Sequence, residues 1–333
     1  MNPHSSKEYK ISEFLLKNSN GISVKILSYG GIIQEINFPD KNGFNENIVL
    51  SYTDPKDYIK DNFYIGALIG RYANRISKSS FELNEEIFKL TNNESENHLH
   101  GGYKGFHNVN WSFDKKNIKE DSITLTNFSK NFDNGYPGNL NVSVKYTLSN
   151  TNILDIEFYA ISDRDTIFNP TSHSYFNLNP RNKTIVKHRL KINSHKFLEI
   201  DKNFIPKEEF KNTTSTPFDF ISEKIIGDDI NKNDEQLNIT KGYDHCFVLN
   251  KVEKIAAELS ESESGRSIQI LTDQPGIQLY TGNHLKGVFS KNQGLCLETQ
   301  HFPNSPNIEK FPSTLLKANE EFYSKTSYHF KIL

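Results

Sequence analysis

Short runs of alternating apolar and polar residues, separated by turn-forming residues, recur along most of this chain. Residues 22–26 alternate after the Asn20-Gly21 turn, residues 32–38 lead into the turn sequence 40–43, and residues 48–52 follow it. Alternation at every second residue is typical of a strand with one buried face, and glycine and asparagine between two such runs indicate a hairpin. The sequence therefore predicts an all-β fold of antiparallel strands.

The same pattern continues to the C-terminus, whereas helical periodicity is limited to short stretches at 54–58 and 221–230. The polar stretches 92–97 and 231–238 are short enough to be surface loops. Because neither a linker nor a repeat divides the chain, we expect one domain over residues 1–333, a large antiparallel β-sandwich with few short helices and a shared cleft. The further expected strands lie at 123–125, 142–148, 154–158, 246–249, 255–259, 268–271, 277–280, 294–297 and 328–332.

Charge and cysteine content restrict the partners and the compartment. Thirty-nine basic and 41 acidic residues give a net charge of -2, so no global field favours nucleic acid or an anionic membrane, and we expect a neutral partner. Cys246 and Cys296 are too few for a disulfide framework and are predicted to be buried thiols. Met1 to Ser12 lacks the apolar region of a secretory signal, so a cytoplasmic protein is expected, although export with a leader already removed stays open.

The stretch 169–178 combines a histidine with aromatic and amide side chains. Tyr and Phe favour an extended strand here, in which His173, Tyr175 and Asn177 share one face. A histidine that titrates near neutral pH beside a tyrosine suits a small polyhydroxylated ligand. The alternative is a half-buried histidine that is satisfied by a backbone carbonyl.

Two further stretches in the first half carry polar side chains suited to a ligand. In 70–76, Asn74 and Arg75 fall in a compact segment, and the planar guanidinium of Arg75 can donate to several hydroxyls, unless it is only a surface arginine. In 97–102, His98 and His100 would share a face if the chain is extended, next to glycines that allow close approach. Two such histidines suit a metal, but the glutamate of a cupin-type site does not follow, so we expect no metal.

The second half supplies carboxylates and amides. Asp244 precedes a histidine and a cysteine, but neighbours on a strand face opposite ways, so these three side chains do not form a triad, and Asp244 is interpreted as an acceptor for a hydroxyl. Gln278 can donate to and accept from a neutral ligand. Glu298 interrupts an apolar strand, either at its exposed end or at a cleft.

Together these residues suit proton transfer on a neutral sugar. The chain contains histidines, carboxylates and amides, but neither a phosphate-cradling glycine loop nor a nucleophile elbow. Opening a cyclic aldose requires a base at the anomeric hydroxyl and an acid at the ring oxygen, and closure on the other carbonyl face gives the opposite anomer. One base and one acid are enough for this reaction.

Several motifs in a fixed order resemble the aldose 1-epimerase, or galactose mutarotase, family, and the resemblance runs from about residue 10 to the C-terminus. Departures include Tyr72, His98, Ser215 and Ile221, where other residue types are expected; they leave the preferred sugar open. The segments that carry the resemblance are 70–76, 97–102, 135–138, 169–178, 216–220, 244–245, 274–283 and 297–300.

The resemblance implies a single antiparallel β-sandwich with an open cleft, a free monosaccharide as substrate and no cofactor, in a monomer or homodimer. Glu298 would then be the base at the anomeric hydroxyl, His173 the acid at the ring oxygen, and His100 would assist at that end. The side chains expected to hold sugar hydroxyls are Asn74, Arg75, Asp244 and Gln278.

Three rival functions are weighed against this one. A non-catalytic carbohydrate-binding sandwich would use the same cleft but would need neither acid nor base, so His173 and Glu298 favour catalysis. A metal-dependent isomerase would use His98 and His100. A retaining glycosidase would need two carboxylates about 5 Å apart, which the sequence cannot place.

Overall fold

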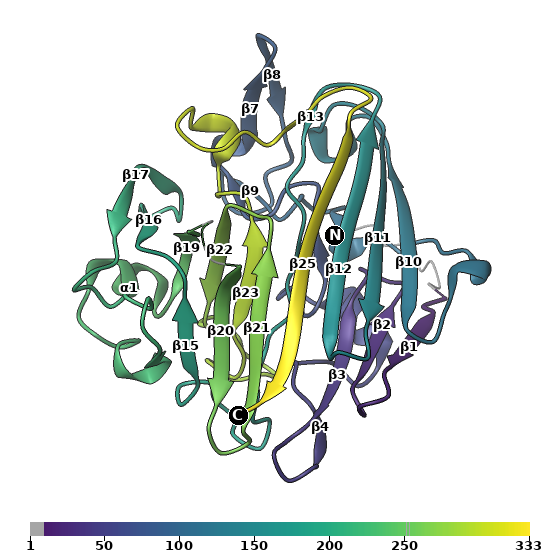
Figure 1. Cartoon of the computed structure of the whole chain (residues 1–333). Helices are drawn as coiled ribbons and strands as arrows, with labels where there is room; N and C mark the ends of the chain where they lie inside the picture. Colours follow the sequence, from purple (N-terminus) through teal and green to yellow (C-terminus); the bar gives the residue numbers. More distant parts are fainter. Residues whose placement is uncertain (1–9, 251, 253) are drawn as a thin grey trace.

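The computed structural model describes residues 10–250, 252 and 254–333 (Figure 1) and confirms the predicted all-β class. Its largest element is an eight-stranded antiparallel sheet. The C-terminal strand β25 lies between β12 and β21 and so joins the two halves of this sheet, as the yellow strand in Figure 1 shows. In spatial order the strands are β10 (Ser122–Ser129), β11 (Leu140–Leu148), β12 (Ile153–Ser162), β25 (Glu321–Ile332), β21 (Arg266–Thr272), β20 (Ile255–Glu261), β15 (Arg189–Ile192) and β18 (Lys224–Ile225).

The fold also contains two smaller antiparallel sheets beside the eight-stranded one. A four-stranded sheet follows the sequence order β1 (Glu13–Lys17), β2 (Ser23–Leu27), β3 (Ile33–Pro39) and β4 (Asn45–Asn47). A five-stranded sheet has the order β17 (Pro206–Asn212), β16 (Lys196–Ile200), β19 (Asp244–Val248), β22 (Gly276–Tyr280) and β23 (Cys296–Gln300). The five-stranded sheet supplies the carboxylates of the site described below.

One apolar cluster is shared by all three sheets. Val144 of β11 alternates with half-exposed residues, as the strand's pattern of buried and partly buried positions shows. It belongs to the same buried cluster as Ile36 of β3 and Phe247 of β19. Burial of such side chains, at about 25 cal/mol per Å² of apolar surface, is the main term that holds stacked sheets together. The strands therefore form a packed frame on which loops are carried.

The remaining elements are short. The only α-helix in the described residues is α1 (Glu235–Thr240). Within those residues no helix has the length and apolar character that crossing a membrane requires. The short strands are β5 (Leu68–Ile69), β6 (Arg75–Ile76), β7 (Ser80–Leu83), β8 (Glu86–Lys89), β9 (His98–Leu99), β13 (Thr166–Ile167), β14 (Thr171–Ser172) and β24 (Leu315–Leu316). The 3₁₀ helices are Pro55–Lys60, Ser77–Ser79, Phe106–Asn108, Lys115–Asn117, Asp133–Gly135, Ile226–Asp228 and Ser305–Asn307.

Two sequence predictions of local structure were wrong. Residues 48–52 form no strand, because the side chain of Asn47 accepts the backbone N–H of Ile36 at 3.0 Å and ends the ladder with β3. The helix lies at 235–240 and begins within the predicted loop 231–238, because Asp234 caps it by accepting from the N–H groups of Gln236 and Leu237. The predicted burial of both cysteines is confirmed.

Arg266 ties the eight-stranded sheet to its neighbours. Its side chain is fully buried and donates to three backbone carbonyls, those of Phe38 at 3.0 Å, Leu178 at 2.9 Å and Phe44 at 2.9 Å. It also contacts Glu46 at 3.1 Å. A single guanidinium therefore satisfies carbonyl groups of two segments that lie far from β21 in sequence.

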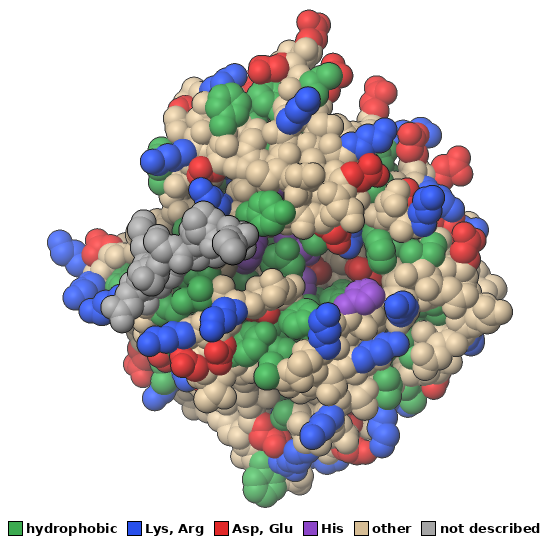
Figure 2. Space-filling model, turned by 180° about the vertical axis from the view of Figure 1, so that it is seen from behind, with side chains coloured by type: hydrophobic (Ala, Val, Ile, Leu, Met, Phe, Trp, Pro, Cys, Tyr) green, Lys and Arg blue, Asp and Glu red, His purple; other side chains and the backbone are tan. Residues whose placement is uncertain are grey.

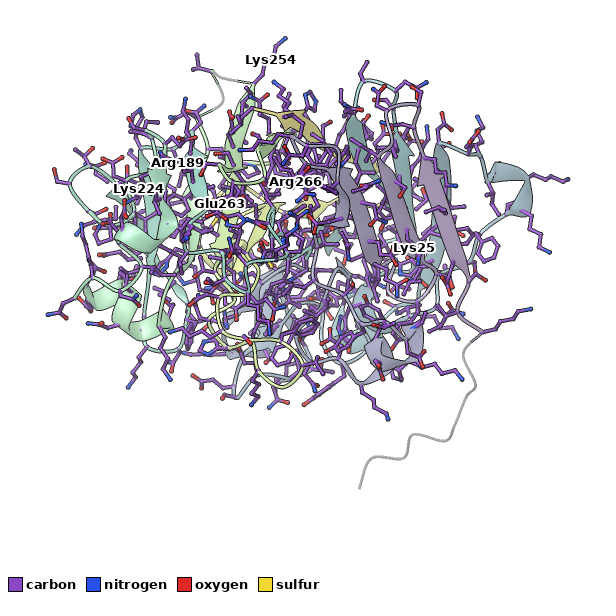
Figure 3. The ribbon with its side chains drawn as sticks, turned by 90° about the horizontal axis from the view of Figure 1, so that it is seen from below. Lys25, Arg189, Lys224, Lys254, Glu263 and Arg266 are labelled. Atoms are coloured by element: carbon purple, nitrogen blue, oxygen red, sulfur yellow. The ribbon has the colours of Figure 1, made fainter. Side chains whose placement is uncertain are left out.

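We expect Arg266→Met to lower the free energy of unfolding by about 3 kcal/mol or more, because it leaves buried carbonyls unpaired. Arg189→Met is the matched control, since the side chain of Arg189 is 43% exposed and its pairing with Glu223 at 3.2 Å is a surface ion pair, worth at most about 1 kcal/mol. Both arginines can be followed in Figure 3. Urea denaturation compares the two variants, and equal losses would contradict the assignment.

Candidate functional site

A cleft of about 210 Å³ opens over one face of the five-stranded sheet. Figure 2 shows a hollow with histidine and acidic atoms at its floor. The walls come from segments far apart in sequence, including residues 62–64, 74–75 and 99–100, together with His173, Tyr175, Asp244, Tyr280 and Glu298. The structure therefore brings six of the seven predicted site residues to one cleft: Asn74, Arg75, His100, His173, Asp244 and Glu298.

Strand register explains how the sheet presents the polar residues. Glu298 on β23 lies directly opposite Gln278 on β22, and Asp244 on β19 lies opposite Tyr280, two residues further along β22. Residues opposite each other in an antiparallel pair share a face, as do residues two apart on one strand. All four side chains therefore project from the same face.

Gln278 differs from the other predicted residues. It is buried and does not line the cleft. Its amide donates to the carboxylate of Asp244 at 2.7 Å. The structure thus places Gln278 as a support of Asp244, which itself reaches the cleft. Burial raises the pKa of Asp244, and the charge of Arg75 and the Gln278 hydrogen bond oppose that rise.

His173 and Glu298 meet at the base of the cleft. Nε2 of His173 lies 3.7 Å from Oε1 of Glu298, and the two side chains are 4% and 2% exposed. The second carboxylate oxygen of Glu298, Oε2, is buried without a hydrogen-bond partner. Burial raises the pKa of Glu298 well above its ordinary value and lowers the pKa of His173 to about 4. Because the two pKa values shift in opposite directions, a proton shared by this pair resides on Glu298 and leaves His173 neutral when no sugar is bound.

His100 is fixed as a hydrogen-bond donor toward the cleft. Its backbone has φ of 51°, and its Nδ1 accepts the backbone N–H of Asn74 at 3.2 Å. Burial, followed by the charges of His173 and Arg75, lowers its pKa well below the ordinary value, so the ring is neutral. A neutral ring whose Nδ1 accepts carries its proton at Nε2.

Arg75 is held by two groups that the sequence interpretation did not include. Its guanidinium donates to both carboxylate oxygens of Glu94, at 2.6 and 2.8 Å, and lies 4.8 Å from the ring centroid of Phe204. A bidentate clamp orients the planar group and leaves its remaining N–H donors free for other acceptors. Arg71, by contrast, is buried and donates to backbone carbonyls such as those of Pro137 and Gly138, so neither arginine is a simple surface residue.

Three aromatic or imidazole side chains at the cleft were missed in the sequence. The ring of Tyr64 lies 4.7 Å from that of His100 and 5.8 Å from that of His173. Tyr280 lines the cleft, and its hydroxyl accepts the backbone N–H of His284 at 3.1 Å. His284 is exposed and also lines the cleft. Of these, only Tyr280 lay in a predicted strand, and its spacing of two from Gln278 was the one available signal.

The stretch 169–178 is less regular than predicted. Only Thr171–Ser172 forms a strand, β14, and Phe176 makes single bridges to Val49 and Leu295. His173 and Tyr175 both line the cleft. Asn177 does not join them, because its amide donates to the carbonyls of Asn182 and Gln293, at 2.9 and 2.8 Å. The prediction of one shared face was therefore wrong for Asn177.

The prediction that His98 and His100 share a face was also wrong, and with it the pairing on which the rival metal-dependent isomerase depends. Nε2 of His98 lies 2.7 Å from the hydroxyl of Tyr136, and its Nδ1 lies 2.6 Å from the carbonyl of Thr91, away from the cleft. A different trio, His100, His173 and Glu298, has its ligand atoms within 4.8 Å of one another. A metal-binding histidine normally donates from its other nitrogen, whereas Nδ1 of His100 accepts, so the trio fits a proton-transfer site better than a metal.

We expect Glu298→Gln to be more stable than the wild type above neutral pH. Because the folded pKa of Glu298 lies above its unfolded value, its favourable contribution is complete below the unfolded pKa and is lost as the pH rises through the folded pKa. Glutamine removes this loss, so at pH 8 the variant gains about 1 to 3 kcal/mol, the usual cost of a buried unsatisfied group. Urea denaturation from pH 4 to pH 8 checks this, and a wild type that is the more stable at pH 8 contradicts it.

Known proteins with similar sequences belong to one enzyme family. The family described as aldose 1-epimerase matches residues 12–329. An aldose 1-epimerase of Haemophilus influenzae is 35% identical over 328 residues, covering 95% of this chain and 94% of its own length. A galactose mutarotase of Sus scrofa is 35% identical over 333 residues, covering 97% and 94%.

Solved structures agree with these sequence matches. An aldose epimerase homologue from C. elegans superposes with a TM-score of 0.91 at 28% identity, covering 97% of this chain and 99% of that one. A galactose 1-epimerase from Lactobacillus acidophilus gives 0.88 at 31% identity, covering 98% and 96%. The predicted resemblance and the galactose mutarotase-like sandwich are thereby confirmed, and a purely carbohydrate-binding role is not favoured. This chain belongs to the aldose 1-epimerase family, a family of isomerases that act on carbohydrates.

Proposed function

We propose that the cleft interconverts the α and β anomers of free aldohexoses such as galactose and glucose, by opening and reclosing the sugar ring. The observation that carries this is the buried pair of His173 and Glu298, 3.7 Å apart at the base of a cleft of about 210 Å³. A base and an acid at this distance from each other can act on the anomeric hydroxyl and the ring oxygen of the same sugar. The related aldose 1-epimerases and galactose mutarotases support the same reaction for this chain.

The proton balance of the proposed reaction uses only these two groups. Glu298, as carboxylate, takes the proton of the O1 hydroxyl while the bond between C1 and O5 breaks. His173, as imidazolium, gives its proton from Nε2 to O5, which leaves an open-chain aldehyde with a neutral pair. After rotation about the bond between C1 and C2, Glu298 returns a proton to O1 and His173 removes one from O5 as the ring closes.

Burial of the pair favours the open-chain stage of this cycle. The pKa directions show that the dry cleft disfavours the charged pair and favours neutral His173 beside protonated Glu298. That neutral pair is the protonation state reached when the ring has opened. Desolvation therefore raises the energy of the charged pair from which ring opening starts, and so favours the two proton transfers of that half-reaction.

The other polar groups are proposed to hold the sugar. His100 donates from Nε2 at the ring-oxygen end, since its Nδ1 is occupied. Arg75 supplies donors from a guanidinium that Glu94 keeps in place, and Asp244 supplies an acceptor that Gln278 steadies. Asn74 lines the same cleft. This alternation of fixed donors and acceptors suits the hydroxyls of a neutral hexose.

The shared core and the two cysteines bear on the assembly and the compartment of the protein. We propose a single domain that works as a monomer or homodimer, and the support is one apolar cluster that all three large sheets share. We propose a cytoplasmic location because Cys246 and Cys296 are both free thiols, as is usual for proteins of a reducing compartment.

Substitution of either reacting group should remove most of the catalysis. We expect Glu298→Gln and His173→Gln each to lower kcat by roughly 10² to 10⁴-fold, the usual contribution of a general acid or base. Polarimetry of freshly dissolved α-galactose and α-glucose measures the rate. Glu263→Gln is the matched control, because Glu263 is an exposed carboxylate that lies outside the cleft. Wild-type equilibration by Glu298→Gln removes the base assignment, and a wild-type chain that binds sugar without speeding equilibration supports the carbohydrate-binding rival.

Substitution of Arg75 should act on binding more than on chemistry. We expect Arg75→Met to raise KM about tenfold with a smaller change in kcat, because hydrogen bonds from a charged group contribute about 1.5 to 3 kcal/mol to both bound states. Glu94→Gln keeps the guanidinium but weakens its clamp, so it should raise KM by less. Steady-state polarimetry separates the two constants, and an unchanged KM in Arg75→Met contradicts the contact.

A further inference from the structure

The nitrogen of His173 that faces away from Glu298 has a partner that the proposed reaction does not use. Sγ of Cys296 lies 3.4 Å from Nδ1 of His173. Cys296 is fully buried and free. Cys296 and Glu298 are two residues apart on β23, so their side chains project from the same face. One strand therefore contacts both ring nitrogens of His173, with a thiol at Nδ1 and a carboxylate at Nε2.

The two contacts of the ring indicate which nitrogen carries the proton. Nε2 faces Glu298, which holds the proton of the pair, so Nε2 presents its lone pair there. The proton of the neutral ring is then on Nδ1, and Sγ of Cys296 accepts from it.

We propose that Cys296 is a positioning residue, whose sulfur holds the His173 ring in the orientation and tautomer that present an unprotonated Nε2 to Glu298 and the sugar. The inference rests on the proposed acid and base roles of this pair. In the closing half-reaction it is this lone pair that removes the proton from O5, so a ring with its proton on Nε2 could not act.

A thiol suits this position because it is a weak acceptor. A carboxylate at Nδ1 would stabilise the imidazolium and keep His173 charged, as an opposite charge within a few ångströms does. Sulfur orients the ring while adding little to its proton affinity. The same weakness leaves room for His173 to gain and lose its proton during each cycle.

The remaining groups around His173 do not supply this contact. The rings of Tyr64, Tyr175 and His100 pack against it at centroid distances of 5.8, 5.0 and 5.3 Å. His107 interacts with it electrostatically. Neutral Tyr64 and Tyr175 carry no charge, and His100 and His107 are neutral because burial lowers the pKa of each. Among these groups, Glu298 is thus the one facing His173 that changes its protonation state during the proposed reaction.

The test compares Cys296→Ala and Cys296→Ser with Cys246→Ala. Cys246 is the matched control, because it is the other buried free thiol and lies on the same face of the sheet, opposite Gln278. The first readout is the ¹⁵N spectrum of histidine-labelled protein without sugar, in which Nδ1 and Nε2 of His173 are assigned from the spectrum of His173→Gln. The second is the pH profile of kcat and KM by polarimetry.

In Cys296→Ala we expect the His173 signals to shift toward the tautomer protonated at Nε2, and kcat to fall about tenfold or more with a smaller change in KM. Cys296→Ser should restore the Nδ1 tautomer and move the acid limb of the kcat profile to higher pH, because oxygen is the stronger acceptor. Cys246→Ala should match the wild type in both readouts.

Unchanged His173 signals in Cys296→Ala, or equal changes in Cys246→Ala, would overturn the inference. If Cys296→Ala does not fold, Cys296→Ser decides the matter, since an unmoved acid limb of the kcat profile in that variant would overturn the inference as well. The spectra need no activity, so a wild type that fails to speed mutarotation refutes the proposed function and leaves the tautomer result standing separately.

Discussion

Desolvation of one carboxylate beside one imidazole is the constraint on which the account of this protein depends. Glu298 is buried on β23 of the five-stranded sheet, and its Oε2 atom finds no hydrogen-bond partner. A carboxylate in such a position is costly when charged, so its proton is held more tightly than in water. The neighbouring His173 loses affinity for a proton for the same reason. The cleft thus contains two groups that each gain or lose a proton as the proposed reaction proceeds.

The rest of the fold maintains this arrangement. The antiparallel register of β19, β22 and β23 sets Asp244, Gln278 and Glu298 on one face. The histidines approach this face from loops of other parts of the chain, and backbone contacts such as that between Asn74 and His100 fix their rings. A large sandwich is useful here because its packed strands hold these loops in place.

Much of the fold followed from the sequence because alternation directly reports which face of a strand is buried. Hairpins such as the one between β11 and β12 were predicted near their observed limits. The strand expected at 48–52 failed because a single side chain, Asn47, replaces a ladder hydrogen bond, which no periodicity reveals. The helix α1 was missed because Gln236 and Thr240 are among its buried residues, so its inner face lacks apolar periodicity.

The site was predicted chiefly through the ordered motifs of the family, and individual residue types gave less. Strand spacing correctly separated Asp244 from His245, which is buried against Phe218 outside the cleft. It failed for His98 and His100, because the left-handed backbone of His100 turns the two rings apart. The contacts of Glu94 with Arg75 and of Tyr64 with His100 depend on tertiary folding, and no local pattern of the sequence encodes them.

Infrared difference spectroscopy of wild type against Glu298→Gln, in the absence of sugar at pH 7, tests the central claim most directly. The account predicts that the wild type contributes the C=O stretch of a protonated carboxylic acid in an apolar setting, which the variant lacks. A difference spectrum containing only the symmetric and antisymmetric carboxylate bands would contradict it, because Glu298 would then be ionised when no sugar is bound.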